Sequence, residues 1–231
     1  PREKETDVVH IRRISYRMNG GDYHHEFRTH LHIIPARGGK SRQITKGDWS
    51  VESFTWSADG TRIYFTGNIT EDTDYTYRRN LYSIPTSGGR ARTLCGLPGH
   101  LSSPESSPDG KKVAFVGNDR KRGNGTSNYL YTVSSGGGKP RCVTNHLDVS
   151  VGQSVGSDSR AASPSFGPVW SPDGKSISFL TSIEGSDRLL SLSLDTGKTT
   201  KFASKNTTIE SYSCDARQTS AAFTRMSPTE L

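Results

Sequence analysis

One serine in this chain has the spacing of an enzymatic nucleophile. Ser154 lies in Gly152-Gln-Ser154-Val-Gly156, which fits the Gly-x-Ser-x-Gly pattern of a tight strand-to-helix turn that presents a serine beside an oxyanion hole. The surrounding sequence argues against this chemistry, because no helical pattern follows the serine and the last histidine of the chain, His146, precedes it. We therefore expect no catalytic residue in this chain.

A second segment resembles the end of a phosphate-binding loop. Gly38-Gly39-Lys40-Ser41 has the last residues of that loop, but Ile34 stands where the loop needs a glycine, five positions before Gly39. We interpret the segment as a hairpin turn between two strands.

Four histidines, His24, His25, His30 and His32, lie close together in the sequence. His30 and His32 would share one face of a strand, a spacing that can hold a metal ion. No cysteine lies nearby, and later repeats carry other residues at the corresponding positions, so we interpret the histidines as surface residues. We predict no metal site and no cofactor.

Carboxylates gather in two segments that we expect to be loops. Glu71, Asp72 and Asp74 lie in the first, and Asp148 and Asp158 lie in the second. Such groups could serve acid–base or cation chemistry, but the sequence does not determine the distances between them. We favour the interpretation that they are solvated loop acids.

Any functional site in this chain would have to be positioned by strands that belong to a repeated sequence pattern. Three similar segments recur, and each is followed by a short strand-like run that ends in a phenylalanine: Trp56-Ser-Ala-Asp-Gly60, Ser106-Ser-Pro-Asp-Gly110 and Trp170-Ser-Pro-Asp-Gly174. The phenylalanines at positions 65, 115, 179 and 223 are 50, 64 and 44 residues apart. This period fits four-stranded propeller blades.

Each repeat contains an Asp-Gly pair, which we predict to be a tight hairpin turn: Asp59-Gly60, Asp109-Gly110 and Asp173-Gly174. Glycine tolerates a positive φ angle, and the aspartate side chain can bond to the nearby backbone. Trp56 and Trp170 precede two of these turns, and we expect them to pack between blades rather than to stack on a ligand. We therefore interpret these residues as structural.

The repeats predict an all-β fold, a β-propeller of four-stranded antiparallel blades of the TolB or WD40-like type. The chain holds about four blades' worth of strands, and we expect them to form one domain over residues 1–231. The ring of blades is expected to be incomplete. The blade portions are expected at about 1–46, 50–97, 100–146, 164–205 and 209–231, with a long loop at 145–166. The last portion is degenerate, because Arg217-Gln218 stands at the Asp-Gly position. Since both ends fall partway through a repeat, we expect a fragment.

The composition argues against a membrane protein and against a nucleic-acid-binding protein. The 231 residues are 30% hydrophobic, and no run reaches the roughly 18 to 20 apolar residues that cross a bilayer, so we expect no membrane partner. The net charge of +7 is spread over the repeats. Cations recur at one blade position (Arg42, Arg92, Arg141 and Lys201), which favours a solvated strand face over a nucleic-acid interface.

The sequence is compatible with more than one cellular compartment. Three cysteines, Cys95, Cys142 and Cys214, stand at non-equivalent repeat positions and imply no disulfide framework, which favours the cytoplasm. Three glycosylation sequons, at positions 68, 124 and 206, are compatible instead with a secreted or periplasmic protein.

Taken together, the repeats resemble the propeller of prolyl oligopeptidase-family serine peptidases, in particular the acylaminoacyl-peptidase and dipeptidyl-peptidase branch. The opening segment from Arg13 to Tyr23 and the segment Leu147-Asp-Val-Ser-Val-Gly152 followed by Ser157-Asp-Ser-Arg160 carry the resemblance. The resemblance implies a C-terminal α/β-hydrolase partner domain and peptide substrates. None of the family's catalytic serine, aspartate and histidine maps onto this chain, so the implied role is to gate access.

The residues that we expect to face the hydrolase or its cavity are those that depart from the repeat: Tyr16, Arg17, Tyr23, Asp148, Asp158 and Arg160. The alternative is a free-standing, TolB-like propeller that acts as a protein-interaction scaffold. Both functions are compatible with a homo-oligomer.

Overall fold

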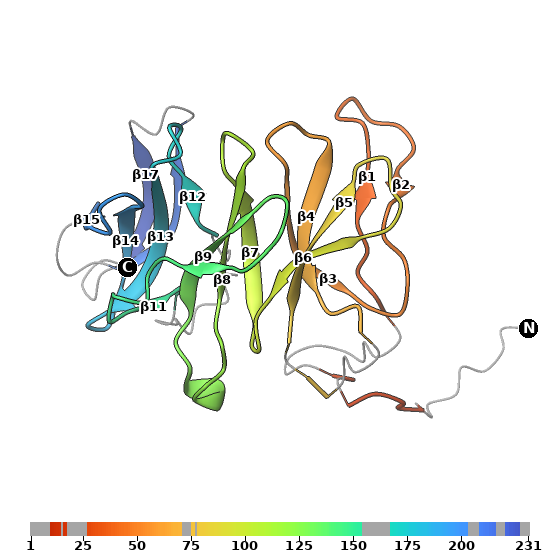
Figure 1. Ribbon diagram of the computed structural model, residues 1–231, viewed down its shortest axis with the longest axis horizontal. Coiled ribbons are helices and arrows are strands. Elements are labelled where there is room, and N and C mark those ends of the chain that lie inside the picture. Colours follow the sequence, from red (N-terminus) through yellow and green to blue (C-terminus); the bar gives the residue numbers. More distant parts are fainter. Residues whose placement is uncertain are drawn as a thin grey trace, which may run out of the picture.

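The computed structural model describes residues 10–14, 16–17, 27–70, 75–76, 78–153, 167–202, 208–215 and 220–226 (Figure 1). In these residues the regular elements are antiparallel strands and one short 3-10 turn, Gly123–Gly125. The first complete sheet has the order β3-β4-β5-β6, with bounds Val51–Trp56, Arg62–Gly67, Asn80–Pro85 and Arg92–Gly96. The second runs β7-β8-β9-β10, with bounds Leu101–Ser106, Lys112–Gly117, Tyr129–Ser134 and Arg141–Cys142.

The third sheet has a divided first strand. It contains β11 (Ser150–Val151), β12 (Val169–Trp170), β13 (Ser176–Ile183), β14 (Ser186–Ser193) and β15 (Thr199–Lys201). Both β11 and β12 pair with β13, at Ser182–Thr181 and Ser178–Ile177 respectively. The expected loop at 145–166 therefore contains half of a strand, β11, and residues 154–166 lie outside the described part of the chain.

Two-stranded sheets lie at the two ends of the arrangement. One end carries β1 (His32–Ile33) and β2 (Arg42–Gln43), and the other carries β16 (Thr208–Cys214) and β17 (Ala221–Met226). Figure 1 shows the sheets following one another in an open arc from β1 to β17. The fold is thus an all-β propeller arrangement of four-stranded antiparallel blades, and the described sheets do not close a ring.

Hydrophobic side chains fill the spaces between successive sheets. Because neighbouring residues on a strand point to opposite faces, Phe65 packs toward β1–β2 while Tyr64 packs toward the second sheet. Phenylalanines at one repeat position are almost fully buried in each complete sheet: Phe65 is 0%, Phe115 0% and Phe179 1% exposed. The cores therefore lie between blades, and each blade depends on its neighbours for burial.

The Asp-Gly turns share one hydrogen-bond network. In the second sheet the Ser107 hydroxyl donates to Asp109 Oδ1 (2.7 Å) and accepts from the Lys112 backbone N–H (2.9 Å). Gly110 has a φ of +68°, in the left-handed region that favours glycine. The first and third sheets repeat this geometry around Asp59 and Asp173, where Gly60 and Gly174 have φ angles of +68° and +67°.

This network makes the turn serine a testable stabiliser. The serine hydroxyl, followed by a backbone N–H, lowers the pKa of Asp109. A carboxyl whose folded pKa is depressed adds stability above its unfolded pKa and loses it as the pH falls through the folded value. We expect Ser107→Ala to lower the free energy of unfolding by about 1 kcal/mol near neutral pH, and by less in acid, where Asp109 is protonated.

Urea titrations at about pH 7 and about pH 2 test this expectation, because the stabilisation is lost only as the pH falls through the lowered pKa of Asp109. The exposed hairpin residue Ser87 provides a control, since Ser87→Ala removes a hydroxyl outside the turn network. An equal loss for Ser107→Ala at both pH values would contradict the role given to the carboxylate.

Candidate functional site on the inner strands

The first strands of successive sheets are joined by polar contacts. The Ser103 backbone N–H on β7 donates to Ser53 Oγ on β3 (3.0 Å), and Ser53 Oγ also bonds Thr66 Oγ1 (2.6 Å). Ser103 has a φ of +51°, and the β7–β8 register shifts between Ser102 and Glu105. The irregular backbone of β7 thus lies where this strand meets its neighbour.

Glu105 on β7 connects three sheets. Its Oε2 accepts from Thr55 Oγ1 on β3 (3.1 Å), and its backbone carbonyl accepts from Trp170 Nε1 on β12 (3.1 Å). Burial raises the pKa of Glu105 above its usual range, while the Thr55 hydroxyl lowers it in part. No repeat pattern marks Glu105 in the sequence, because the corresponding positions, Thr55 and Val169, carry no acid.

Both flanks of segment 154–166 are bonded to the next inner strand, β16. On one flank, the Gln153 side-chain amide donates to the backbone carbonyls of Ile209 (3.1 Å) and Glu210 (2.7 Å). On the other flank, the Tyr212 hydroxyl is 3.3 Å from the carbonyl of Gly167 and 3.3 Å from that of Ser178. Tyr212 is 4% exposed, and burial raises its pKa. These contacts place the two flanks of the segment against the same strand.

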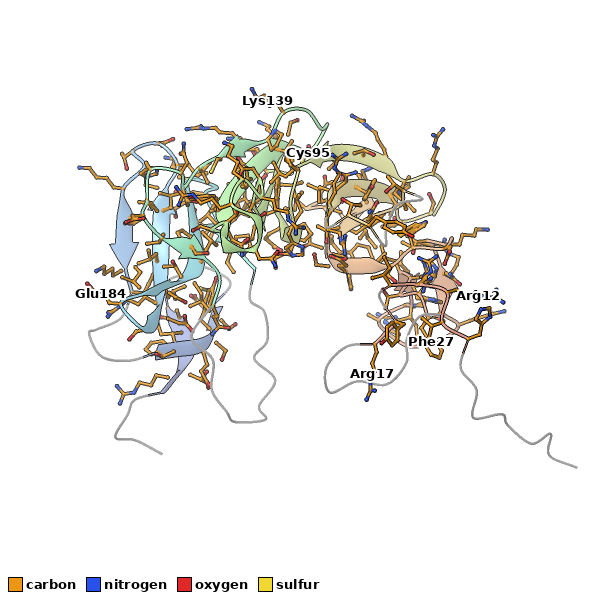
Figure 2. The ribbon with its side chains drawn as sticks, turned by 90° about the horizontal axis from the view of Figure 1, so that it is seen from below. Arg12, Arg17, Phe27, Cys95, Lys139 and Glu184 are labelled. Atoms are coloured by element: carbon orange, nitrogen blue, oxygen red, sulfur yellow. The ribbon has the colours of Figure 1, made fainter. Side chains whose placement is uncertain are left out.

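The predicted gating residues lie on different parts of the arc. Tyr16 and Arg17 belong to the segment before β1, and Figure 2 shows Arg17 on the same side as Arg12 and Phe27. Asp148 is exposed and directly precedes β11 in the third sheet. The other three candidates, Tyr23, Asp158 and Arg160, lie outside the described residues, as does Ser154. The gating role of all six stays a prediction.

The recurring cations have a structural partner that the sequence did not reveal. Arg42 on β2 donates through Nη1 to the Ser87 carbonyl (2.9 Å) and through Nη2 to the Thr86 carbonyl (2.5 Å) of the next hairpin. Arg92 on β6 donates in the same way to the Gly136 carbonyl. Two of the four recurring cations therefore hold neighbouring blades together, where the sequence had suggested only a solvated face.

The two repeat tryptophans differ in their surroundings. Trp170 is 5% exposed and packs in the cluster between the second and third sheets, as expected. Trp56 is 47% exposed, so the expectation of packing between blades does not hold for it among the described residues. Trp56 pairs with Ile63, which packs in the cluster on the side of β1 and β2, so Trp56 faces this end and not the second sheet.

Of the histidine and acidic candidates that the sequence offered, His24, His25, Glu71, Asp72 and Asp74 lie outside the described residues, whereas His30 has ordinary structural surroundings. His30 Nδ1 is 3.3 Å from Thr45 Oγ1, and the His30 ring meets Trp49 edge-on at 5.6 Å between ring centroids. Within the described ranges, no group of three or more His, Cys, Asp or Glu side chains is placed to hold a metal ion. The same ranges contain no helix that is long and apolar enough to cross a membrane.

The sequons are not equivalent. Asn68 is 6% exposed, and its Oδ1 accepts from the Thr70 backbone N–H (3.0 Å). Asn124 lies in the exposed Gly123–Gly125 turn, and the third sequon lies outside the described part of the chain.

Comparison with known proteins places this fold. The structure is similar to TolB from Acinetobacter baumannii, with a TM-score of 0.63 and 17% identity, over 87% of this chain and 44% of that chain. It is also similar to an acylaminoacyl peptidase from Pyrococcus horikoshii (TM-score 0.62, 13% identity, 94% of this chain and 31% of that chain). Puromycin hydrolase gives a TM-score of 0.57 at 16% identity, over 78% of this chain and 28% of that chain. The fold is therefore a TolB-like β-propeller.

Sequence comparison finds a family model that matches part of the chain. Residues 18–111 match the family model described as the dipeptidyl peptidase IV (DPP IV) N-terminal region. This partial match agrees with the resemblance that the sequence motifs predicted. The peptidase structures, at 16% and 13% identity, show a shared fold. No curated protein matches the sequence. The chain spans less than half the length of each of the three structures named above.

Proposed function

We propose that this chain is the non-catalytic propeller portion of a serine peptidase of the acylaminoacyl, dipeptidyl or oligopeptidase type. Its role is to gate the access of peptides to a hydrolase domain outside residues 1–231. The observation that carries the proposal is the match of residues 18–111 to the N-terminal region of a peptidase family. The match covers the end sheet and the first complete blade, where the repeat is regular.

The proposed mechanism is steric selection rather than chemistry. A propeller that covers an active site admits short or unfolded peptides and excludes folded proteins, because a folded domain cannot pass between its loops. Tyr16, Arg17, Tyr23, Asp148, Asp158 and Arg160 are the proposed contacts to the hydrolase or its cavity.

The similarity to TolB favours a second candidate function. A free-standing propeller would use one loop face to bind a protein partner, with no peptidase attached. The TM-scores to TolB and to the acylaminoacyl peptidase are nearly equal, at 0.63 and 0.62, so the fold does not separate the two functions.

The test uses the protein encoded by the whole reading frame. A fluorophosphonate probe, which labels activated serines, is expected to modify a serine outside residues 1–231, and the protein is expected to cleave short peptides but not folded substrates. The 231-residue chain alone provides the control and should hydrolyse neither. If the reading frame has no Gly-x-Ser-x-Gly turn followed by Asp and His, and the probe labels no serine, the peptidase proposal is contradicted and the scaffold function is favoured.

A further inference from the structure

Two arginines lie on one face of the first complete sheet, on either side of a buried serine. Ser83 on β5 pairs with Tyr64 on β4 and with Arg92 on β6, so these three side chains form a row across the sheet. Arg62, two residues before Tyr64 on β4, points to the same face and donates through Nε to Ser83 Oγ (2.6 Å). This face packs on the second sheet, because Tyr64 belongs to the cluster between the two sheets.

A groove of about 580 Å³ lies between this face and the second sheet. Arg62, Tyr64 and Arg92 line it from the first sheet, and the hairpin residues Ser135 and Gly136 line it from the second. Both sheets contain all four strands of a blade. The groove is therefore a feature of the packing of two complete blades and does not depend on the ends of the arc.

The two guanidinium groups keep donors that no described residue uses. The Arg62 guanidinium donates through Nε to Ser83, and the Arg92 guanidinium donates through Nη2 to the Gly136 carbonyl. Within the described residues, Nη1 and Nη2 of Arg62 and Nε and Nη1 of Arg92 have no acceptor. Arg62 is partly buried, and unpaired N–H groups of such a cation are unfavourable unless water or a ligand accepts from them.

The Tyr64 hydroxyl adds a third donor in the groove. Tyr64 is 3% exposed. Burial and then the charge of Asp59 raise the pKa of Tyr64, whereas a hydrogen bond from Ser135 and the charge of Arg62 partly oppose this rise. The phenol group therefore lies close to Ser135 and Arg62 and keeps its proton at neutral pH, so it can donate to an acceptor in the groove.

Two carboxylates also line the groove but are engaged elsewhere. Asp59 Oδ1 accepts from the Ser57 hydroxyl, and Asp109 Oδ1 accepts from the Ser107 hydroxyl, within their own Asp-Gly turns. Both aspartates are exposed, so water and salt screen their charges. The ion pairs between described residues involve neither Arg62 nor Arg92. The donors of the two arginines are thus not neutralised by these acids.

The other complete sheets do not repeat this arrangement. At the positions of Arg62 and Tyr64, the second sheet has Lys112 and Ala114, and the third sheet has Ser176 and Ser178. The blade fold is therefore compatible with smaller or different side chains here. Packing alone does not account for two arginines and a buried tyrosine on one face.

We propose that the groove between the first and second complete sheets is an oxyanion-binding site, in which Arg62, Arg92 and the Tyr64 hydroxyl hold a phosphate or carboxylate group. The planar fork of a guanidinium matches both kinds of group, because two parallel N–H bonds can meet two oxygens. The phenol O–H supplies a further donor to the same anion. None of the proposed gating residues lines this groove, so the site does not depend on the proposed function.

Isothermal titration calorimetry of the protein encoded by the whole reading frame tests the site. Inorganic phosphate and acetate are titrated separately, which distinguishes a phosphate ligand from a carboxylate ligand. We expect saturable binding of at least one anion at neutral pH, and weaker binding when sodium chloride is added. Arg62→Gln should weaken this binding by at least about tenfold, because it removes both the charge and the fork. Tyr64→Phe keeps the ring and should weaken it by about tenfold.

Arg90→Gln is the matched control. Arg90 is an exposed arginine in the β5–β6 hairpin of the same sheet and does not line this groove, so its loss should leave the affinity unchanged. Arg62→Lys is a second variant that the fold accommodates, since Lys112 occupies the same position in the second sheet. Lysine keeps the charge but not the fork, and we expect about threefold weaker binding.

Three results would overturn the proposal. The absence of saturable binding for both anions excludes the site. Equal losses for Arg62→Gln and Arg90→Gln show attraction to the overall positive charge of the chain instead. Circular dichroism checks that each variant keeps its sheets. If Arg62→Gln does not fold, an unchanged affinity of Arg62→Lys contradicts the role given to the guanidinium.

Discussion

Phe115→Ala is expected to lower the free energy of unfolding by about 3 to 5 kcal/mol, the usual cost of removing a buried aromatic ring. Phe115 is 0% exposed on β8, and its ring stacks on Tyr131 at 5.5 Å between centroids. The ring lies in the cluster between the first and second sheets, with Tyr64 and Leu101. Its loss leaves a cavity that neither sheet can fill without moving, so the effect reaches both blades.

Urea titration of the chain at low concentration provides the measurement. Phe202→Ala is the matched control, because Phe202 is 51% exposed and the same atoms are removed from a site largely in water. We expect the control to change stability by no more than about 0.5 kcal/mol. Similar losses for both variants would show that the cores between blades do not hold the arc together.

Trp170→Ser should produce a second loss of about 3 to 5 kcal/mol. The indole is 5% exposed, packs on the second sheet and donates to the Glu105 carbonyl, so serine removes both the buried surface and the hydrogen bond. Trp170→Phe separates the two contributions, because it retains most of the apolar surface. Beyond the effect of the smaller ring, we expect Trp170→Phe to lower the free energy of unfolding by about 1 kcal/mol, because the Glu105 carbonyl loses the hydrogen bond from Nε1.

Trp56→Ser tests whether burial or repeat position decides the effect. Trp56 occupies the same repeat position but is 47% exposed, so we expect a loss well below that of Trp170→Ser. Equal losses at the two positions would contradict the difference in packing that the structure assigns to them. Thermal unfolding followed by tryptophan fluorescence offers an independent measurement.

Local patterns were enough to predict the blades. The Asp-Gly turns depend on residues a few positions apart, and the structure contains the corresponding hairpins, β3–β4, β7–β8 and β12–β13, with glycine at a positive φ angle. Alternate residues of a strand point to opposite faces, and in this stack of sheets both faces of β4 and β8 are buried. The family resemblance depended on motifs of the same local kind.

The hydrogen bonds between blades could not be predicted from the sequence. Glu105, Gln153 and Tyr212 bond to residues on the neighbouring strands, at sequence separations of 50, 56 and 45 residues. A residue that bonds to a distant backbone carbonyl leaves no signal in its own segment, since any carbonyl can accept the bond. The same reason concealed the partners of Arg42 and Arg92.

By itself, the sequence determined the fold class, the strand order within each blade and the turn chemistry, because these depend on hydrogen bonds and side-chain spacing within about 45 residues. The tertiary structure alone decided that the first strand of the third sheet is divided and that Trp170 is buried while Trp56 is exposed. The physical reason is that burial in a propeller is supplied by the next blade. Identical residues in identical repeats therefore differ according to the strands that lie beside them.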